Sequence, residues 1–546
     1  MILAWITLLP LLGAALVMLV PREEEAVHRG LGLATALATF VVSLLILPDF
    51  DAAVPGFQLE VNKLWIGQLG IRFHLGVDGI SLWLVLLTTF LMPVTLLSPQ
   101  AIGIRNIRVR EFTVAMLVLE AGMIGAFLAL DLFVFYVFWE LMLIPMYFII
   151  GIWGGERRLY ASIKFVIYTL IGSLLMLVAI LYLYAQYRAA TGGFSFDYTA
   201  LSHLTLPYGP QMLCFAAFGL AFAIKVPVFP LHTWLPDAHV EAPTGGSVIL
   251  AGVMLKFGTY GLLRFALPMF PLAAADAAPL VAILAVIGIV YGALMAYVQD
   301  DAKKLVAYSS VSHLGFVVLG LMTLSAAGTQ GAIYQMLAHG ISTGGLFLGV
   351  GLLYDRRHSR KLADFGGLWA KMPVFAACFL VIVLASVGLP GLCGFVGEFL
   401  ILIGAFTADQ TWAASGLPEL FPAAKLMTAI SASAVILAAM YLLTMYQKLM
   451  FGPLDKPENR SSHMRDISGR ETWVFGIVIV AALVMGIWPK PILDRSEKSV
   501  QAYLSLYGQR LNDARKSPDA PPHIFPPLPA PAAAAPAPSP APGANQ

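Results

Sequence analysis

Charged residues are scarce in this sequence of 546 residues: they make up 12% of it, while 59% of the residues are apolar. An ordinary soluble domain carries roughly 25% charged residues, so the composition excludes a soluble protein. Apolar runs near the length of about 20 residues that crosses a bilayer as a helix recur along the chain, which also excludes a β-barrel with its alternating strands. We therefore expect an all-α polytopic integral membrane protein.

Cysteine is also rare. The three cysteines, Cys214, Cys378 and Cys393, lie in apolar stretches without a CxxC pair. We expect them to be small buried side chains, so no metal or other cofactor is predicted in this chain. A net charge of +2, with basic residues scattered over the loops, excludes nucleic acid as a partner. The N-terminus lacks the basic segment of a signal peptide and is expected to form an uncleaved first span.

Apolar windows of about 19 residues predict the membrane-spanning helices. The fourteen expected spans lie near residues 2–20, 30–48, 79–98, 112–130, 132–151, 161–184, 211–229, 245–265, 278–298, 303–323, 330–353, 374–406, 425–450 and 472–488. Pro227 and Pro230 interrupt the seventh span, and Pro390 with its neighbouring glycines interrupts the twelfth. In lipid, broken helices persist only beside protein or a water-filled cavity, so these two discontinuous helices indicate a transport site.

The two broken helices are five spans apart, which suggests two copies of a five-helix unit. An odd number of spans per copy places the second copy upside down in the membrane, as an inverted repeat. The expected organisation is 1–111 with spans 1–3, 112–265 as the first repeat (spans 4–8), 278–450 as the second repeat (spans 9–13), 472–488 as span 14, 489–516 as an amphipathic segment lying on the outer interface or on a partner, and 517–546 as a disordered Pro/Ala-rich tail.

Lysine and arginine positions predict the orientation. The loops that follow odd-numbered spans carry 18 of these residues, and the loops that follow even-numbered spans carry five, Arg264 among them. By the positive-inside rule the odd-numbered loops are cytoplasmic. Both termini are therefore expected on the outer side of the membrane.

A few charged or titratable side chains fall near the middle of predicted spans, where a charge costs about 2.5–3.5 kcal/mol on insertion scales. The candidates are Glu140, Lys225, Lys256, Glu398, His313 and His339, with Glu120 and Lys164 as further ones. The structural alternative is that each is a buried, paired residue that fixes helix packing, or, for Lys164, a lysine that reaches the headgroups. Replacing a buried ion pair is often neutral, so stability alone explains such residues poorly.

Proton transfer is the chemistry that these residues favour. An ion pair between Glu140 and Lys225 is plausible, and making or breaking it would change the proton affinity of both groups. His313 and His339 could relay protons between Lys256 and Glu398, aided by water at the helix breaks.

Four motifs in this chain are long and specific. They are the stretches FHLGVDGIS at 73–81, FWEL at 138–141, KVPVFPLHTWLPDAH at 225–239 and DAKKLVAYSSVSH at 301–313. They resemble the antiporter-like subunits of respiratory complex I, and the likeness runs from about residue 60 to 490. Glu398 stands in the stretch GLPGLCGFVGE, where sister subunits carry lysine. The chain is therefore most similar to the M-type members of this family.

The resemblance implies a proton-pumping unit of a bacterial inner membrane, driven by NADH oxidation and quinone reduction in other subunits. NADH, FMN, iron–sulfur clusters and quinone would belong to those partners, and sister antiporter-like subunits would lie on both sides. By family role, Glu140 and Lys225 would be a coupled pair, Lys256 the central lysine, His313 and His339 relays, and Glu398 the terminal group on the exit side. Glu120 also matches a position that the family uses.

Three alternatives stay open at this point. A subunit of a multi-subunit sodium/proton antiporter shares most of the motifs, and Glu398 argues against it. The membrane arm of a membrane-bound hydrogenase is the second. The third is a structural spacer, whose buried charges would serve only to dock helices.

Overall fold

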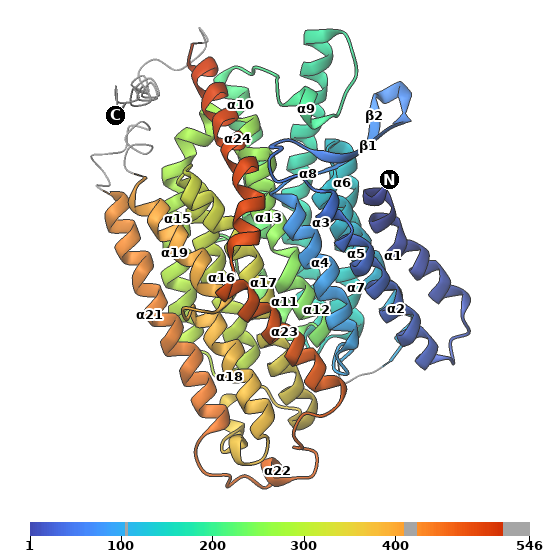
Figure 1. Ribbon diagram of the computed structural model, residues 1–546, viewed down its shortest axis with the longest axis vertical. Coiled ribbons are helices and arrows are strands. Elements are labelled where there is room, and N and C mark those ends of the chain that lie inside the picture. The colour runs from blue at the N-terminus through green and yellow to red at the C-terminus, as the bar shows by residue number, and fades with distance from the viewer. Residues whose placement is uncertain (104–106, 409–422, 517–546) are drawn as a thin grey trace, which may run out of the picture.

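The computed structural model describes residues 1–103, 107–408 and 423–516. Its helices run side by side along the long axis of the molecule, with α1 and α2 at one edge and α21 at the other (Figure 1). Helices occupy all the ranges expected for spans, and eleven of the described helices are long and apolar enough to cross a membrane. Three shorter apolar helices add to them. The chain is thus a mostly helical, multi-pass membrane protein, and the total of fourteen spans stays a prediction.

The elements follow one another along the chain in two groups. The first comprises α1 (Ile2–Leu19), α2 (Glu25–Leu44), α3 (Ile46–Asp49), β1 (Gln58–Ile66), β2 (Ile71–Val77), α4 (Ser81–Leu97), α5 (Val109–Leu128), α6 (Leu132–Leu141), α7 (Leu143–Trp153), α8 (Arg158–Thr191), α9 (Tyr198–Leu201), α10 (Tyr208–Lys225), α11 (Trp234–Glu241), α12 (Thr244–Ile249), α13 (Lys256–Gly261) and α14 (Leu267–Met269). The second comprises α15 (Pro271–Tyr297), α16 (Ala302–Met322), α17 (Ala326–Arg357), α18 (Pro373–Val387), α19 (Cys393–Phe406), α21 (Ala423–Met450), α22 (Pro457–Arg460), α23 (Arg470–Ile487) and α24 (Lys490–Arg515).

Both broken helices have physical causes in the sequence. α10 ends at Lys225 and the chain becomes helical again at α11, so Pro227 and Pro230 lie in the gap. Proline lacks the backbone N–H that a continuing helix needs. α18 ends before Gly388, whose φ of +84° is a left-handed conformation that glycine adopts without steric cost. Pro390 lies between Gly388 and the start of α19.

The eighth and eleventh expected spans form the centre of the bundle. The most apolar window of the segment Thr244–Met269 is entirely buried, and so is that of α17. Within the first of these, π-helical turns at Leu250–Met254 and Leu262–Ala266 flank α13 on both sides. π turns inside helices often mark functional sites. Lys256, the first residue of α13, therefore lies at a buried and irregular point of the helix.

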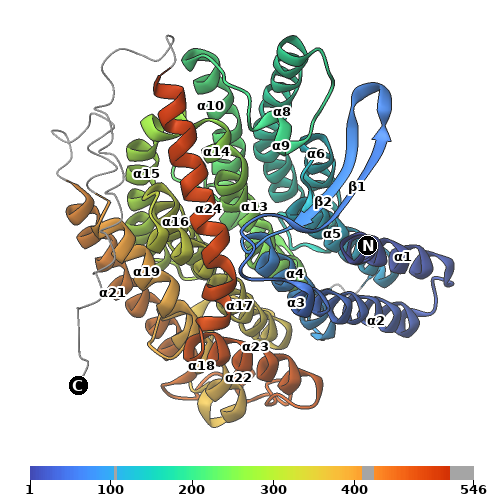
Figure 2. The same cartoon turned by 45° about the horizontal axis from the view of Figure 1, so that its top comes forward.

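α24 falls within residues 489–516, where the sequence predicted an amphipathic segment on the outer interface or on a partner, and it packs on its own chain. It lies across the helices of the body in both views (Figures 1 and 2). The Gly79 N–H donates to the Ser499 hydroxyl at 3.0 Å, and Tyr507 donates to the Pro271 carbonyl at 3.2 Å. A Cβ at Gly79 would lie 2.1 Å from the Arg495 carbonyl oxygen, so only glycine permits this approach. The expected tail 517–546 lies outside the described residues.

A β-hairpin between the second and third expected spans is a feature that the sequence analysis missed. β1 and β2 pair antiparallel, and the hairpin extends away from the helices (Figure 2). Its inner end is joined to the bundle, because the Leu130 N–H between α5 and α6 donates to the His74 carbonyl at 2.8 Å.

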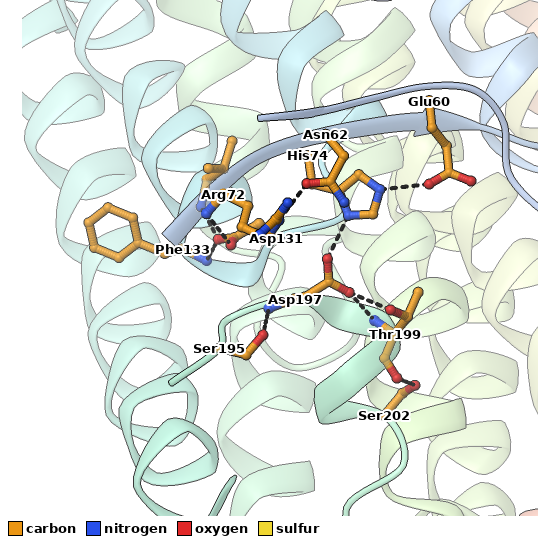
Figure 3. A network of polar contacts seen from close by, with 11 residues as sticks. Glu60, Asn62, Arg72, His74, Asp131, Phe133, Ser195, Asp197, Thr199 and Ser202 are labelled. Atoms are coloured by element: carbon orange, nitrogen blue, oxygen red, sulfur yellow. Dashed lines mark hydrogen bonds and ion pairs between the residues drawn. The ribbon is translucent and has the colours of Figure 1, made fainter. Parts of the chain in front are cut away.

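His74 connects the hairpin to the chain between α8 and α9 (Figure 3). Its Nδ1 lies 2.6 Å from a carboxylate oxygen of Asp197, and its Nε2 lies 2.7 Å from Glu60. Burial lowers the pKa of His74, but the hydrogen bonds to Asp197 and Glu60 outweigh burial and raise that pKa above its ordinary value. Burial also raises the pKa of Asp197, but hydrogen bonds from His74 and Thr199 outweigh it and the pKa is lowered. We call Glu60, His74 and Asp197 the histidine clamp.

We expect the histidine clamp to hold the hairpin in a pH-dependent manner. The contribution of His74 to the stability of the hairpin is complete below the ordinary imidazole pKa of 6.5. It is lost as pH rises through the raised pKa that His74 has in the folded protein. The contribution of Asp197 is present above the ordinary carboxyl pKa of 3.8 and is lost as pH falls through the lowered value. The backbone amides at 58–77 should therefore exchange hydrogen faster in His74→Gln than in the wild type. The ratio of the two exchange rates should be largest at about pH 6 and should shrink towards about pH 9. A ratio that is the same at both pH values contradicts a charged clamp.

Candidate functional site

Lys225 and Glu140 lie on neighbouring helices, α10 and α6, but they are not in contact. The Lys225 ammonium is buried and lies over two aromatic rings, 5.3 Å from the centre of Trp139 and 5.6 Å from that of Phe165. No ion pair of Lys225 occurs within the described residues, although its charge and that of Glu140 act on each other. The ion pair that the sequence made plausible is thus absent from this structure, in which the aromatic rings hold the ammonium by cation–π contacts.

Lys256 is joined directly to His339. Its buried ammonium lies 2.7 Å from His339 Nδ1 and donates to the Ala251 carbonyl at 2.5 Å. Ala251 belongs to the π turn before α13. An ammonium can only donate, so while Lys256 is charged His339 must accept at Nδ1 and carry its own proton on Nε2. The proton that His339 can pass on is therefore the one on Nε2, at the side of the ring away from Lys256.

His313 and Glu398 form the second half of the site. His313 Nδ1 lies 2.9 Å from Glu398 Oε1, and the side-chain amide of Gln335 donates to the same oxygen at 3.1 Å. The hydroxyl of Tyr441 lies 3.4 Å from His313 Nε2. All four groups are buried.

The two halves meet at the histidines. The ring centres of His313 and His339 are 6.0 Å apart. Lys256, His339, His313 and Glu398 therefore form one buried row across α13, α17, α16 and α19, which we call the proton row. The sequence predicted these four residues, and the structure brings them together.

The two remaining candidates lie elsewhere. Glu120 is fully buried in α5, and neither of its carboxyl oxygens has a hydrogen-bond partner within the described residues. Lys164 on α8 bonds the Asp237 carboxylate at 2.7 Å and the Thr233 carbonyl at 2.9 Å. Lys164 therefore ties α8 to the chain after the break of the seventh span.

Sequence reasoning did not single out Gln335, Tyr441 and His239 among the buried polar residues. Gln335 and Tyr441 contact the proton row, and His239 is fully buried with its ring stacked at 4.6 Å from the centre of the Phe347 ring. A signal existed for Gln335, because it precedes His339 by four residues and so shares its helix face. Tyr441 lies on α21, 128 residues after His313, and no residue spacing in the sequence indicates that the two side chains meet.

The titratable residues of the described ranges do not form a metal site. In those ranges, no group of three or more His, Cys, Asp or Glu side chains is placed to hold a metal ion. The chemistry that the site can support is the passage of protons between a buried amine, two imidazoles and a carboxyl group.

Comparison with known proteins identifies the family. The family described as "NADH:quinone oxidoreductase/Mrp antiporter, TM" matches residues 129–417. NADH-quinone oxidoreductase subunit M of Rhodobacter capsulatus is 46% identical over 520 residues, which are 93% of this chain and 97% of that protein. A chain of respiratory complex I from Thermus thermophilus is 34% identical, with a TM-score of 0.81, over 93% of this chain and all of that one.

A chain of the Mrp complex from Dietzia shares the fold, with a TM-score of 0.77 at 20% identity over 93% of this chain and 98% of that one. The predicted similarity to M-type members is confirmed by the relative from Rhodobacter capsulatus, which is a subunit M. The chain therefore belongs to the family of antiporter-like membrane subunits of NADH:quinone oxidoreductases and Mrp antiporters.

Proposed function

We propose that this chain moves protons across a bacterial inner membrane as a membrane-arm subunit of NADH:quinone oxidoreductase. Redox reactions in partner subunits, which hold the NADH, flavin, iron–sulfur and quinone sites, would supply the energy. The proton row is the observation that carries the proposal, since four titratable groups from four helices lie in one buried line. Likeness to subunit M over 93% of the chain supports the assembly in which it works.

The geometry suggests the order of proton transfers. The Lys256 ammonium gives a proton to His339 Nδ1, and the ring releases its Nε2 proton towards His313. The separation of 6.0 Å between ring centres is one that a bridging water or a ring rotation spans. His313 then passes a proton from Nδ1 to Glu398 Oε1, and Glu398 is the group from which the proton leaves.

Glu140 and Lys225 would control the loading of the row. A lysine held by aromatic rings and not by a carboxylate is free to change its distance to Glu140. Movement of that charge changes the proton affinity of the buried groups around it. Sister antiporter-like subunits on both sides, and both termini on the periplasmic side, complete the proposed arrangement.

Replacement of Glu140 by glutamine tests pumping against a spacer role. We expect NADH-driven proton uptake into inverted membrane vesicles to fall about tenfold, because a neutral amide keeps the shape of the side chain and removes the charge that acts on Lys225. Glu156→Gln, a change at an exposed glutamate outside the spans, serves as the matched control. Pumping at the wild-type level in Glu140→Gln would leave the structural spacer as the better account.

Purification of the tagged chain separates the proposal from the antiporter alternative. We expect NADH:quinone reductase activity to co-purify with the chain, and we expect that activity to be coupled to proton uptake in vesicles. Co-purification without that activity, but with sodium-dependent pH gradients, would assign the chain to a multi-subunit sodium/proton antiporter instead.

A further inference from the structure

Gln335 is a buried amide that contacts the last carboxyl group of the proton row. It lies on α17, one turn before His339, and is 2% exposed. Its Nε2 donates to Glu398 Oε1 at 3.1 Å, the same oxygen that lies 2.9 Å from His313 Nδ1. A Cβ at Gly397 would lie 2.6 Å from Gln335 Oε1, so the glycine allows α19 to approach the amide this closely.

The other end of this amide is unused. Gln335 Oε1 is buried and has no hydrogen-bond partner within the part of the chain that the structure describes. Buried polar atoms are paired in the great majority of cases, so this oxygen requires an explanation. Packing does not provide one, because methionine would fill almost the same space without an unpaired oxygen.

A primary amide can serve both protonation states of a carboxyl group. An ionised carboxylate only accepts hydrogen bonds, whereas a protonated carboxyl group also donates one. The amide NH2 suits the first state and the amide carbonyl suits the second. A rotation of about 180° about the last side-chain bond exchanges the two with almost no change of shape.

We propose that Gln335 is a positioning residue whose amide turns over as Glu398 takes up its proton from His313. This inference rests on the proposed function. Before transfer, His313 is an imidazolium with protons on both Nδ1 and Nε2, and Gln335 donates to the ionised carboxylate of Glu398. During transfer, the Nδ1–H bond breaks and an O–H bond forms on Glu398, which leaves a neutral ring and a neutral carboxyl group. The Gln335 carbonyl then accepts from that O–H and turns it away from His313, so that release to the far side is favoured over return.

The test uses the complete complex in vesicles with Gln335→Met, and it reads both pumping and the infrared C=O band of the protonated Glu398 carboxyl group. Glu398→Gln assigns that band. We expect Gln335→Met to keep NADH oxidation by detergent-solubilised complex, to lower coupled pumping about tenfold, and to shift its pH profile. We also expect the Glu398 band to move to the higher frequency of a carboxyl group that donates no hydrogen bond to the amide.

A matched control is Gln211→Met, because Gln211 is a buried glutamine of α10 whose Oε1 accepts from the backbone N–H of Leu272 and of Ala273, away from the proton row. It should leave the Glu398 band and the pH profile unchanged. Should Gln335→Met not assemble, Gln335→Glu replaces it. The introduced glutamate can both donate and accept a hydrogen bond only when it is itself protonated. We therefore expect Gln335→Glu to show the wild-type Glu398 band and wild-type pumping at acid pH only.

The outcomes separate the two proposals. If Glu398→Gln abolishes pumping while Gln335→Met leaves the band and the pH profile as in the wild type, the positioning role is wrong and the proposed function stands. The positioning role is also wrong if Gln335→Glu behaves alike at acid and alkaline pH. If Glu398→Gln pumps normally, the proton row itself is wrong, and the role of Gln335 falls with it.

Discussion

Replacement of Lys256 by methionine should abolish NADH-driven proton pumping. Lys256 is the only amine of the proton row, and its ammonium lies 2.7 Å from His339. Methionine fills the buried space, and it can neither hold nor transfer a proton. A positioned proton-transfer group contributes about 10²–10⁴-fold to rate, so we expect a loss of at least that lower order. Dye-quenching assays on inverted vesicles with NADH as the fuel measure it.

Two further variants make this result specific. Lys448→Met removes an exposed lysine near the end of α21, and it should pump like the wild type. Lys256→Arg keeps a positive charge at the site, but guanidinium does not release its proton in proteins, so this variant should fail as Lys256→Met does. Normal pumping by the arginine variant would show that charge alone, without proton exchange, suffices at this position.

The proton row was accessible to sequence reasoning because charge is so scarce in the chain. A titratable residue at mid-span, such as Lys256, must find a partner inside the protein, and His313, His339 and Glu398 were the candidates at similar depth. The positions of the helix breaks were equally accessible, since proline and glycine act on the backbone locally.

Depth in a span does not determine which helices are neighbours. The sequence made an ion pair between Glu140 and Lys225 plausible, but the Lys225 ammonium lies against Trp139 and Phe165. Both aromatic residues are ordinary apolar side chains by sequence, and only the packing of α6 and α8 around α10 brings them to the lysine. The contact of Gln335 could not be predicted from the sequence either, because its partner Glu398 is 63 residues away.

The β-hairpin and the Asp78–Arg264 ion pair were the least predictable parts of the fold. The hairpin strand β2 is short and mixes apolar with charged and polar residues, so it does not resemble a membrane span. Arg264 was expected in a loop, yet the structure places it in the second π turn after α12, where it is buried. Its partner Asp78 precedes it by 186 residues, so no local pattern could have revealed the pair.

The Asp78–Arg264 ion pair should be a major source of stability for the packing of α4 against the eighth span. The two side chains are 2.6 Å apart and each is only 6% exposed. Removing one partner of a buried pair leaves an uncompensated charge and costs about 3–5 kcal/mol. Asp78 Oδ1 also accepts from the backbone N–H groups of Ile80 and Ser81 at the start of α4. Asp78→Asn retains an oxygen for those bonds, so its cost reports the lost charge.

We expect Asp78→Asn to lower the thermal unfolding midpoint of the detergent-purified complex and the amount of chain in the membrane. The double variant Asp78→Asn/Arg264→Met should recover much of the loss, because it no longer buries an unpaired guanidinium. Glu111→Gln breaks the ion pairs of the exposed Glu111 carboxylate with Arg22 at 3.7 Å and with Arg110 at 3.5 Å, and should cost no more than about 1 kcal/mol. If Asp78→Asn is as mild as Glu111→Gln, or if the double variant is less stable than Asp78→Asn alone, the buried pair does not hold α4 in place.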